Sequence, residues 1–322
     1  MGVSGPHENL HRPTADPLWR ESYYFNLLGP ELVVETTIGL RPGQGVAERM
    51  ALVFYGDQRL IFNELGRLTE FKPSALQADA VSYNCVAPLE QWHVHVAGEF
   101  LVLPPGEEKE ITSFLLDVRN GQTAERRPVV LDVVFQGVMP PYLYPSGALD
   151  FMGAGTQHYE QVGRWTGTAR VGDDPIHHVT GLGVRDHSWG VRDWLRAEEW
   201  YWVNVLYPDE YLVLGYGRAE GEDWTGSGFT HTNGVTHPLN QINVEAQHDD
   251  STTLLVGETQ VEARAEDGSS FLAGIYRQRG VQIVPARGPE SLLRMSTNAG
   301  AAEDCVWLLQ YGRRERIIAK EE

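Results

Sequence analysis

The chain has 322 residues, and its 42% hydrophobic and 22% charged residues are ordinary for a folded globular protein and exclude wholesale disorder. Its formal net charge is -18, from 26 basic and 44 acidic residues. Because such a surface repels phosphate groups, we expect no nucleic-acid partner and no binding to anionic membranes. The length predicts two domains, or one large β-domain.

The two cysteines, Cys85 and Cys305, form no C-x-x-C pair, so the sequence supports neither a structural zinc site nor a redox motif. The first residues lack a basic segment followed by an apolar one, which predicts no signal peptide. No apolar run approaches the roughly 20 residues that a membrane helix needs. We therefore expect a cytoplasmic protein without a membrane span.

Residues 1–18 are polar and interrupted by prolines, which predicts a flexible N-terminal arm. After Trp19, β-branched and aromatic segments separated by Gly and Pro predict antiparallel strands. These strands are expected near residues 31–40, 51–55, 59–63, 91–96 and 129–135. The best helical pattern is a short turn at 74–78. The sequence therefore predicts an all-β sandwich or barrel architecture.

Three prolines between residues 139 and 147 cannot occupy the centre of a sheet, so this segment is the best candidate for a linker. We expect an N-terminal β domain at 19–144 and a C-terminal β domain at 145–322. Two separate barrels and one long sandwich both fit the periodicity.

The clearest hairpin joins residues 199–207 to 211–217 through Pro208-Asp209-Glu210. Trp200, Trp202 and Asn204 share one face of its first strand, because side chains alternate along a strand. Two indoles and an amide on one face are typical of a cavity wall, so we expect these three residues to bind substrate. Packing against a neighbouring domain is the structural alternative.

The segment 181–194 combines two arginines, two aspartates, one histidine and two tryptophans. If it is extended, Arg185, His187 and Trp189 point to one side and Asp186 points to the other. A carboxyl group in an apolar, Trp-lined site holds its proton more tightly, so Asp186 is expected to donate a proton and His187 to relay it. In the alternative interpretation, Arg–Asp pairs and a buried Trp only hold two sheets together.

The other chemical signals are weak. Histidines cluster in the second half without the spacing of H-E-x-x-H or a carboxylate triad. Gly181-Leu182-Gly183 lacks the third glycine of a dinucleotide fingerprint, and the glycines around Ser227 have the wrong spacing for a nucleophile elbow. We expect no metal, no cofactor and no serine hydrolase.

Asp186-His187-Ser188-Trp189-Gly190 resembles the Asp-His-x-Trp-Gly signature of the AttH and carotenoid 1,2-hydratase (hydroxyneurosporene synthase) superfamily. Tyr159-Glu160-Gln161 and Trp200-Tyr201-Trp202 resemble its flanking strands, and Trp19 to Phe25 resembles the start of its N-terminal domain. The resemblance implies two lipocalin-like antiparallel β-barrel or sandwich domains side by side, and a hydrophobic ligand. Relatives hydrate a carotenoid double bond, and fungal members act as cyclases of the Diels–Alder kind.

The resemblance adds Tyr159 and Glu160 to the expected substrate-binding residues, beside Trp189. Arg185, Arg192 and Asp193 depart from the pattern, and their charges are expected to bind a carboxylate or hydroxyl on the substrate.

The sequence thus predicts a cofactor-independent hydratase, dehydratase or cyclase that acts by acid–base chemistry of Asp186 and His187. Its substrate is expected to be a hydrophobic isoprenoid- or polyketide-like molecule. Trp189, Trp200 and Trp202 are expected to stabilise a cationic carbon by about 0.5–2 kcal/mol each. A lipocalin-like carrier without chemistry and a pericyclase are the alternatives, and a homodimer is left open.

Overall fold

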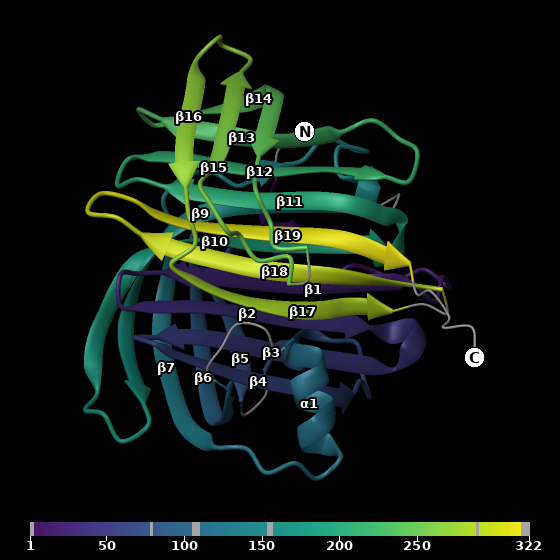
Figure 1. Cartoon of the computed structure of the whole chain (residues 1–322), viewed down its shortest axis with the longest axis vertical. Helices are drawn as coiled ribbons and strands as arrows, with labels where there is room; N and C mark the ends of the chain where they lie inside the picture. The colour runs from purple at the N-terminus through teal and green to yellow at the C-terminus, as the bar shows by residue number, and fades with distance from the viewer. Residues whose placement is uncertain are drawn as a thin grey trace. The chain divides into compact units, whose positions relative to one another are not determined.

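The structure is a computed structural model of the chain, and it describes residues 3–77, 80–104, 110–152, 157–250, 252–287 and 290–316. The described residues contain nineteen strands, one α-helix and short 3-10 helices, so the predicted all-β class is confirmed. Figure 1 shows the strands arranged in large antiparallel sheets. The chain divides into two compact units. Unit 1 comprises Met1–Leu103, Thr123–Tyr144 and Thr156–Val191, and unit 2 comprises Pro104–Gln122, Pro145–Gly155 and Arg192–Glu322.

The sheet of unit 1 closes on itself as an eight-stranded antiparallel barrel. The ring runs β1-β2-β3-β4-β6-β7-β9-β10, and β10 pairs again with β1. The short strands β5 and β8 pair with β6 and β9 outside this ring. The strands are β1 (Trp19–Leu28), β2 (Leu32–Arg41), β3 (Val46–Tyr55), β4 (Gln58–Arg67), β5 (Val81–Ala87), β6 (Gln91–Val102), β7 (Arg126–Gly137), β8 (Tyr142–Leu143), β9 (Gln157–Val171) and β10 (His177–Val191).

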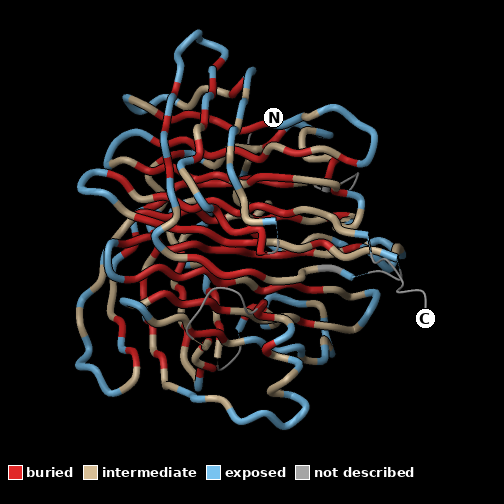
Figure 2. The backbone as a smooth tube through the Cα atoms, in the orientation of Figure 1, coloured by how far each residue is buried: buried red, intermediate tan, exposed pale blue. Residues whose placement is uncertain are grey.

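The inside of this barrel is filled by apolar side chains. Alternate residues of β1, such as Tyr23, Phe25 and Leu27, belong to one buried cluster with Trp92 and Trp165. An eight-stranded barrel is just wide enough for side chains to fill it. Figure 2 shows the buried residues running along the strands and the exposed residues at the turns.

The N-terminal segment packs onto one end of the barrel. A 3-10 helix, η1 (Gly5–Glu8), brings the backbone carbonyl of Glu8 within 3.0 Å of the Tyr23 hydroxyl, which donates to it. The Glu8 side chain is buried. This contact ties the segment that the composition predicted to be a flexible arm to the barrel interior.

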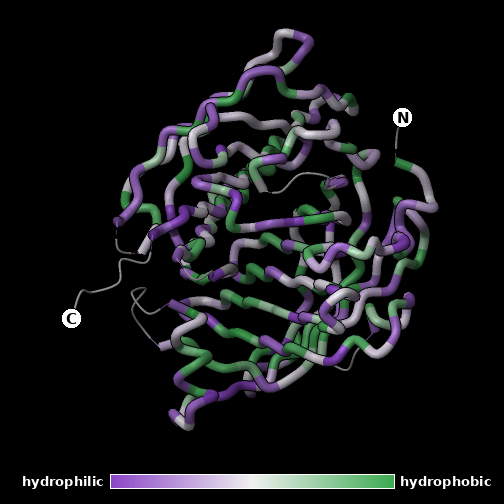
Figure 3. Tube along the Cα trace, turned by 90° about the vertical axis from the view of Figure 1, so that its right-hand side faces the viewer, coloured by the Kyte–Doolittle hydropathy of each residue, from purple (hydrophilic) through white to green (hydrophobic). Residues whose placement is uncertain are grey.

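Unit 2 contains a nine-stranded antiparallel sheet with the order β16-β15-β14-β13-β12-β11-β19-β18-β17. Apolar and hydrophilic residues alternate along many strands (Figure 3), and β16 alternates between exposed and buried positions. The strands are β11 (Ala197–Leu206), β12 (Glu210–Ala219), β13 (Thr225–Thr232), β14 (Val235–Glu245), β15 (Thr259–Ala265), β16 (Ser270–Ile275), β17 (Arg279–Arg287), β18 (Ser291–Ala301) and β19 (Val306–Arg316).

The α-helix of unit 2, α1 (Ile111–Arg119), was not predicted from the sequence. Its N-cap residue, Glu110, accepts hydrogen bonds from the backbone N–H groups of Thr112 and Ser113, which have no partner inside the helix. The same carboxylate accepts from the backbone N–H of Val284, 3.0 Å away, and so attaches the helix to β17. The predicted hairpin is confirmed as β11 and β12, in which Trp202 lies opposite Gly215.

The chain leaves unit 1 at Tyr144, and the expected domain bounds of 19–144 and 145–322 stay a prediction. The chain then returns to unit 1 for β9 and β10. Cys85 and Cys305 are free thiols. Among the described residues, no helix combines the length and apolar character that crossing a membrane requires.

Candidate functional site

The signature segment lies on β10, whose two faces carry different chemistry. On β10, Asp186 lies opposite Tyr24 of β1 and Glu160 of β9. The next residue, His187, lies opposite Tyr23 and Tyr159. Side chains of directly opposite residues share a face, and successive residues point to opposite faces. We call the face with Glu21, Tyr159 and His187 the histidine face, and the face with Tyr24, Glu160 and Asp186 the carboxylate face.

The histidine face is the barrel interior, and His187 lies there at 0% exposure. Its Nε2 is 2.8 Å from Oε1 of Glu21, and its Nδ1 is 3.2 Å from the Tyr159 hydroxyl. The ring stacks on Tyr23 with centroids 3.9 Å apart. Both nitrogens of the imidazole are therefore engaged, and the ring is held in one orientation.

Glu21 is the centre of this cluster. Its carboxylate also accepts from the backbone N–H of His11 and lies 2.9 Å from Nδ1 of that residue. Burial alone would raise the pKa of Glu21, but the hydrogen bonds from His11 and His187 outweigh it and lower the pKa. Burial lowers the pKa of His187, and the hydrogen bond with Glu21 offsets only part of that shift.

Arg185, two residues before His187, is paired inside the barrel. Its guanidinium donates to both Glu8 oxygens, at 2.6 and 3.1 Å, and to Oε1 of Gln161, at 2.7 Å. Burial disfavours the Arg185 cation, but Tyr159 and Glu8 together raise its pKa. The guanidinium of Arg185 thus donates its hydrogen bonds to protein groups. Its contact with a substrate carboxylate stays a prediction.

The carboxylate face is the outside of the same barrel wall, and it combines carboxylates with tyrosine hydroxyls. Tyr144 donates to Glu160 over 2.6 Å, and Nε2 of His158 lies 2.9 Å from the other oxygen of Glu160. Tyr24 donates to Glu35 over 2.8 Å. Burial, reinforced by the neighbouring carboxylates, raises the pKa of Tyr24 and Tyr144 well above 10, so both stay protonated donors at neutral pH.

Asp186 lies in the middle of this face. It is less buried than Glu160, and its charge acts on Arg20, Tyr24 and Tyr144. The register places it directly opposite Glu160, so the two carboxyl groups extend from neighbouring strands to the same side. Asp186 and His187, expected to act together, thus have separate sets of partners.

The remaining predicted residues fall into two groups. Trp189 lies on the histidine face, where its indole stacks on His11 with centroids 3.7 Å apart and planes at 3°. Trp200, Trp202 and Asn204 belong to unit 2, on β11, where they alternate along one face of the strand. Their role in substrate binding stays a prediction.

Several residues of both faces were not found from the sequence. Glu8, His11 and Glu21 come from the first 21 residues, and their partners on β10 lie 166 to 177 residues away. Tyr144 comes from the segment that was expected to be only a linker. The one local signal was His158, which precedes Glu160 by two residues on the same strand and therefore shares its face.

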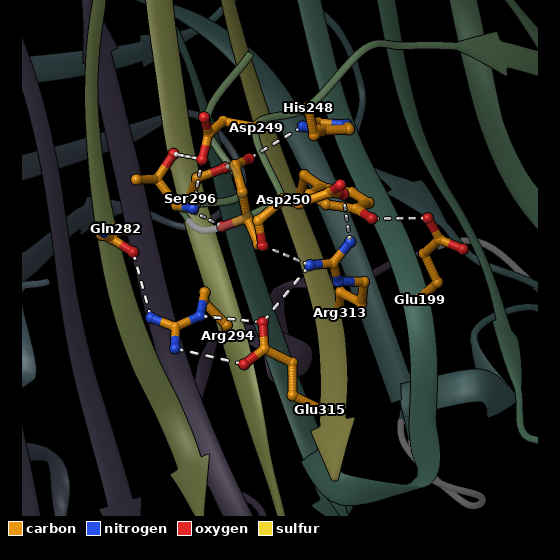
Figure 4. A network of polar contacts seen from close by, with 12 residues as sticks. Glu199, His248, Asp249, Asp250, Gln282, Arg294, Ser296, Arg313 and Glu315 are labelled. Atoms are coloured by element: carbon orange, nitrogen blue, oxygen red, sulfur yellow. Dashed lines mark hydrogen bonds and ion pairs between the residues drawn. The ribbon is translucent and has the colours of Figure 1, made fainter. Parts of the chain in front are cut away.

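Unit 2 has a polar network of its own, shown in Figure 4. Arg313 lies 3.5 Å from carboxylates of both Asp250 and Glu315, and Glu315 also pairs with Arg294. His248 stacks on Tyr311, with ring centroids 3.6 Å apart, and its Nδ1 lies 2.9 Å from the Thr253 carbonyl. A pocket of about 440 Å³ is lined by Tyr201, Val244, Glu245, Ala246, Gln247, Glu258 and Gln260.

The buried ring of His248 predicts that the folded protein loses stability in acid. Burial lowers its pKa to about 4, the Thr253 carbonyl opposes that shift, and Arg313 adds to it. The unfolded chain then binds a proton near the ordinary value of about 6.5, whereas the folded protein does not. Stability is therefore lost as the pH falls from 6.5 to 4, by up to about 3 kcal/mol in the free energy of unfolding.

We expect His248→Phe, which keeps the ring on Tyr311, to lose less stability than the parent between pH 7 and pH 4.5. Urea unfolding at both pH values measures this difference. The exposed His178, replaced in the same way, serves as the control. An equal acid-induced loss in the parent and in His248→Phe would contradict the assignment.

One group of side chains on the histidine face could hold a metal ion. The donor atoms of His11, Glu21 and His187 all lie within 4.8 Å of one another. Glu21 and His187 are buried, and His11 is partly exposed. No other such group is found in the part of the chain that the structure describes.

Comparison with known proteins gives a family and a fold. The model of the family described as "Domain of unknown function (DUF7064)" matches residues 5–292. No curated protein sequence matches the chain. The similar solved structures include a provisionally assigned AttH protein of Nitrosomonas europaea, with a TM-score of 0.54 and 10% identity over 97% of this chain and 96% of that chain.

Two further solved structures have the same fold. Kievitone hydratase from Nectria haematococca has a TM-score of 0.54 and 10% identity, over 97% of this chain and 92% of its own. CghA with Sch210972 has a TM-score of 0.54 and 10% identity, over 96% and 94%. The resemblance to AttH-like proteins inferred from the signature is thus confirmed, and at this identity it establishes the lipocalin-like fold of the two units.

Proposed function

Because this chain belongs to the DUF7064 family, whose function is unknown, we propose an activity from its own residues: the addition of water to, or its removal from, a hydrophobic small molecule. The substrate class is isoprenoid- or polyketide-like. The reaction takes place on the carboxylate face, with Asp186 and Glu160 as the acid–base pair. A carbon–oxygen lyase of this kind needs one group that donates a proton and one that accepts it.

The observation that carries this proposal is the register between β9 and β10. It sets Asp186 and Glu160 directly opposite each other on two strands of a closed barrel. Carboxyl groups on rigid strands keep their separation better than groups on loops. Tyr144 and His158 both hydrogen-bond to Glu160 and hold it in one rotamer. Asp186 is less buried than Glu160, and we assign it the contact with the reacting carbon.

The reaction balances with these two groups. In hydration, the carboxylic acid of Asp186 transfers its proton to one alkene carbon, and the π electrons form the new C–H bond. Water then attacks the cationic carbon and loses a proton to Glu160. The proton passes from Glu160 back to Asp186, so the net change is the addition of one water. Dehydration follows the same steps in reverse.

The tyrosine hydroxyls of this face suit the same chemistry. Tyr24 and Tyr144 remain protonated, because burial raises the pKa of each well above 10. Each donates its one proton to a carboxylate, so its oxygen can accept a hydrogen bond from a substrate hydroxyl or from water. Their ring faces attract a cationic carbon by about 0.5–2 kcal/mol. Trp200, Trp202 and Asn204 remain proposed substrate-binding residues.

Similarity of fold to a protein named kievitone hydratase supports this proposal. Its name describes a hydration, which is the chemistry that the paired carboxyl groups suggest. Cyclisation is the nearest competing reaction, because a cation can also be captured by a second double bond.

Native mass spectrometry of freshly purified protein tests the proposal, with organic extraction and accurate mass of whatever is released. We expect a hydrophobic molecule together with a second species that differs from it by one water. A single unmodified lipid, unchanged after incubation with the protein, would contradict the proposal and favour the carrier alternative.

A further inference from the structure

Three side chains from distant parts of the sequence meet at the end of the barrel where the N-terminal segment packs. His11 comes from that segment, Glu21 from β1 and His187 from β10. Nδ1 of His11 is 2.9 Å, and Nε2 of His187 is 2.8 Å, from the same oxygen of Glu21. All three donor atoms therefore converge on one point.

These donors are the ligands that transition metals prefer. Two imidazole nitrogens and one carboxylate oxygen form the protein ligand set of many zinc and iron sites, and such a set leaves coordination positions for water or a small ligand. Zinc bonds to these atoms at about 2.0–2.2 Å, which separates tetrahedral ligands by roughly 3.3 Å. The two nitrogen–oxygen distances to Glu21, 2.9 and 2.8 Å, need to open by roughly half an ångström, and the two nitrogens already lie within 4.8 Å of each other.

The hydrogen bonds around His187 support a cation at this point. The Tyr159 hydroxyl has one proton, and Oε2 of Glu8, 3.0 Å away, accepts it. The Tyr159 oxygen then accepts from Nδ1–H of His187, 3.2 Å away. In that tautomer the Nε2 lone pair faces the Glu21 carboxylate 2.8 Å away, an arrangement that a bound cation would stabilise.

This arrangement is also the usual support of a metal-binding histidine, whose second nitrogen donates to a fixed oxygen. Tyr159 is fixed by Glu8, and Glu8 is fixed by Arg185 through a pair of hydrogen bonds. The orientation of His187 is set on both sides, by Tyr159 and by the stacked ring of Tyr23.

We propose that His11, Glu21 and His187 bind one divalent transition-metal ion of the Zn²⁺ class. The ion attaches the N-terminal segment to β1 and β10 and therefore stabilises the end of the barrel where that segment packs. The inference does not rest on the proposed lyase activity, because the three ligands lie on the histidine face and the acid–base pair lies on the carboxylate face.

Titration of chelator-treated full-length protein with Co²⁺ tests the site directly. We expect one equivalent of Co²⁺ to bind with visible d–d absorption, one equivalent of Zn²⁺ to displace it, and the melting temperature to rise. Metal content after gel filtration gives the stoichiometry independently.

Two variants separate this site from accidental binding. His11→Ala, at a side chain 24% exposed, is expected to fold and to lose the stoichiometric binding. Tyr159→Phe removes the acceptor for Nδ1–H of His187 and is expected to weaken the affinity by about 10–100-fold. His93→Ala/His95→Ala is the matched control, because those exposed histidines flank Asp132 at 2.8 and 3.3 Å.

Loss of binding in the His93/His95 variant with full binding in His11→Ala would overturn the proposal. So would the absence of stoichiometric Co²⁺ or Zn²⁺ binding, which would mean that a proton alone lies between His187 and Glu21. Neither result would affect the proposed lyase, whose readout is the chemical change of its substrate.

Discussion

Replacing Arg185 with methionine is expected to lower the free energy of unfolding by about 3–5 kcal/mol. The substitution keeps an apolar chain of similar length but leaves the Glu8 carboxylate buried without its partner. The two side chains are only 2% and 3% exposed, so water cannot replace the guanidinium. Urea or guanidinium unfolding at neutral pH measures the loss.

The double variant Glu8→Gln/Arg185→Met distinguishes the broken ion pair from simple loss of packing. With both charges removed, no uncompensated charge stays buried, so we expect the double variant to be more stable than Arg185→Met alone. The exposed pair Arg196–Glu222, at 3.0 Å, is the control, and Arg196→Met should change stability by at most about 1 kcal/mol. Equal losses in Arg185→Met and Arg196→Met would contradict the buried-pair account.

Replacing Asp186 with asparagine is expected to reduce turnover of the co-purifying molecule by about 10²–10⁴-fold. The amide keeps the shape of the side chain but cannot transfer the proton. Glu160→Gln is expected to have a loss of the same order, because the water or the leaving proton needs an acceptor. Initial rates followed by mass spectrometry measure both effects.

The control for this pair is Asp132→Asn, on β7, where the carboxylate is 52% exposed and lies 2.8 and 3.3 Å from ring nitrogens of His93 and His95. We expect its turnover to equal that of the parent. Melting temperatures report whether each variant is folded. A folded Asp186→Asn protein with full turnover would remove Asp186 from the mechanism.

The fold class could be predicted because its signals are local. Alternation, β-branched residues and Gly or Pro at the turns gave the strands around β2, β3, β6 and β7, and the hairpin of β11 and β12. The helix α1 was missed because its nine residues are few for a periodic pattern, and its start depends on a glutamate N-cap, which is not among the preferred N-cap residues.

The site could be predicted only in part. Alternation along β10 was enough to expect His187 and Asp186 on opposite sides, but it could not supply their partners. The partner of His187 is Glu21, 166 residues away, and the partner across from Asp186 is Glu160 in a different strand. Such pairs are fixed by strand register, which depends on how the whole barrel closes rather than on any short segment.

The proposed metal ligands were still harder to predict from the sequence than the partners of Asp186 and His187. The expectation of no metal rested on the absence of H-E-x-x-H spacing, which tests only ligands on one helix. His11 and Glu21 are ten residues apart in a segment and a strand, and His187 lies on another strand. Three ligands on separate elements have no common spacing in the sequence.

The most direct test of the central claim is oxygen transfer from labelled water. Parent protein and Asp186→Asn are incubated in H₂¹⁸O with the molecule that co-purifies, and the masses of the products are measured by mass spectrometry. The account predicts that the parent forms an alcohol carrying one ¹⁸O, and that Asp186→Asn forms it far more slowly. A product of unchanged formula without ¹⁸O would contradict hydration and indicate a cyclase, and no product from any tested alkene or alcohol would indicate a carrier.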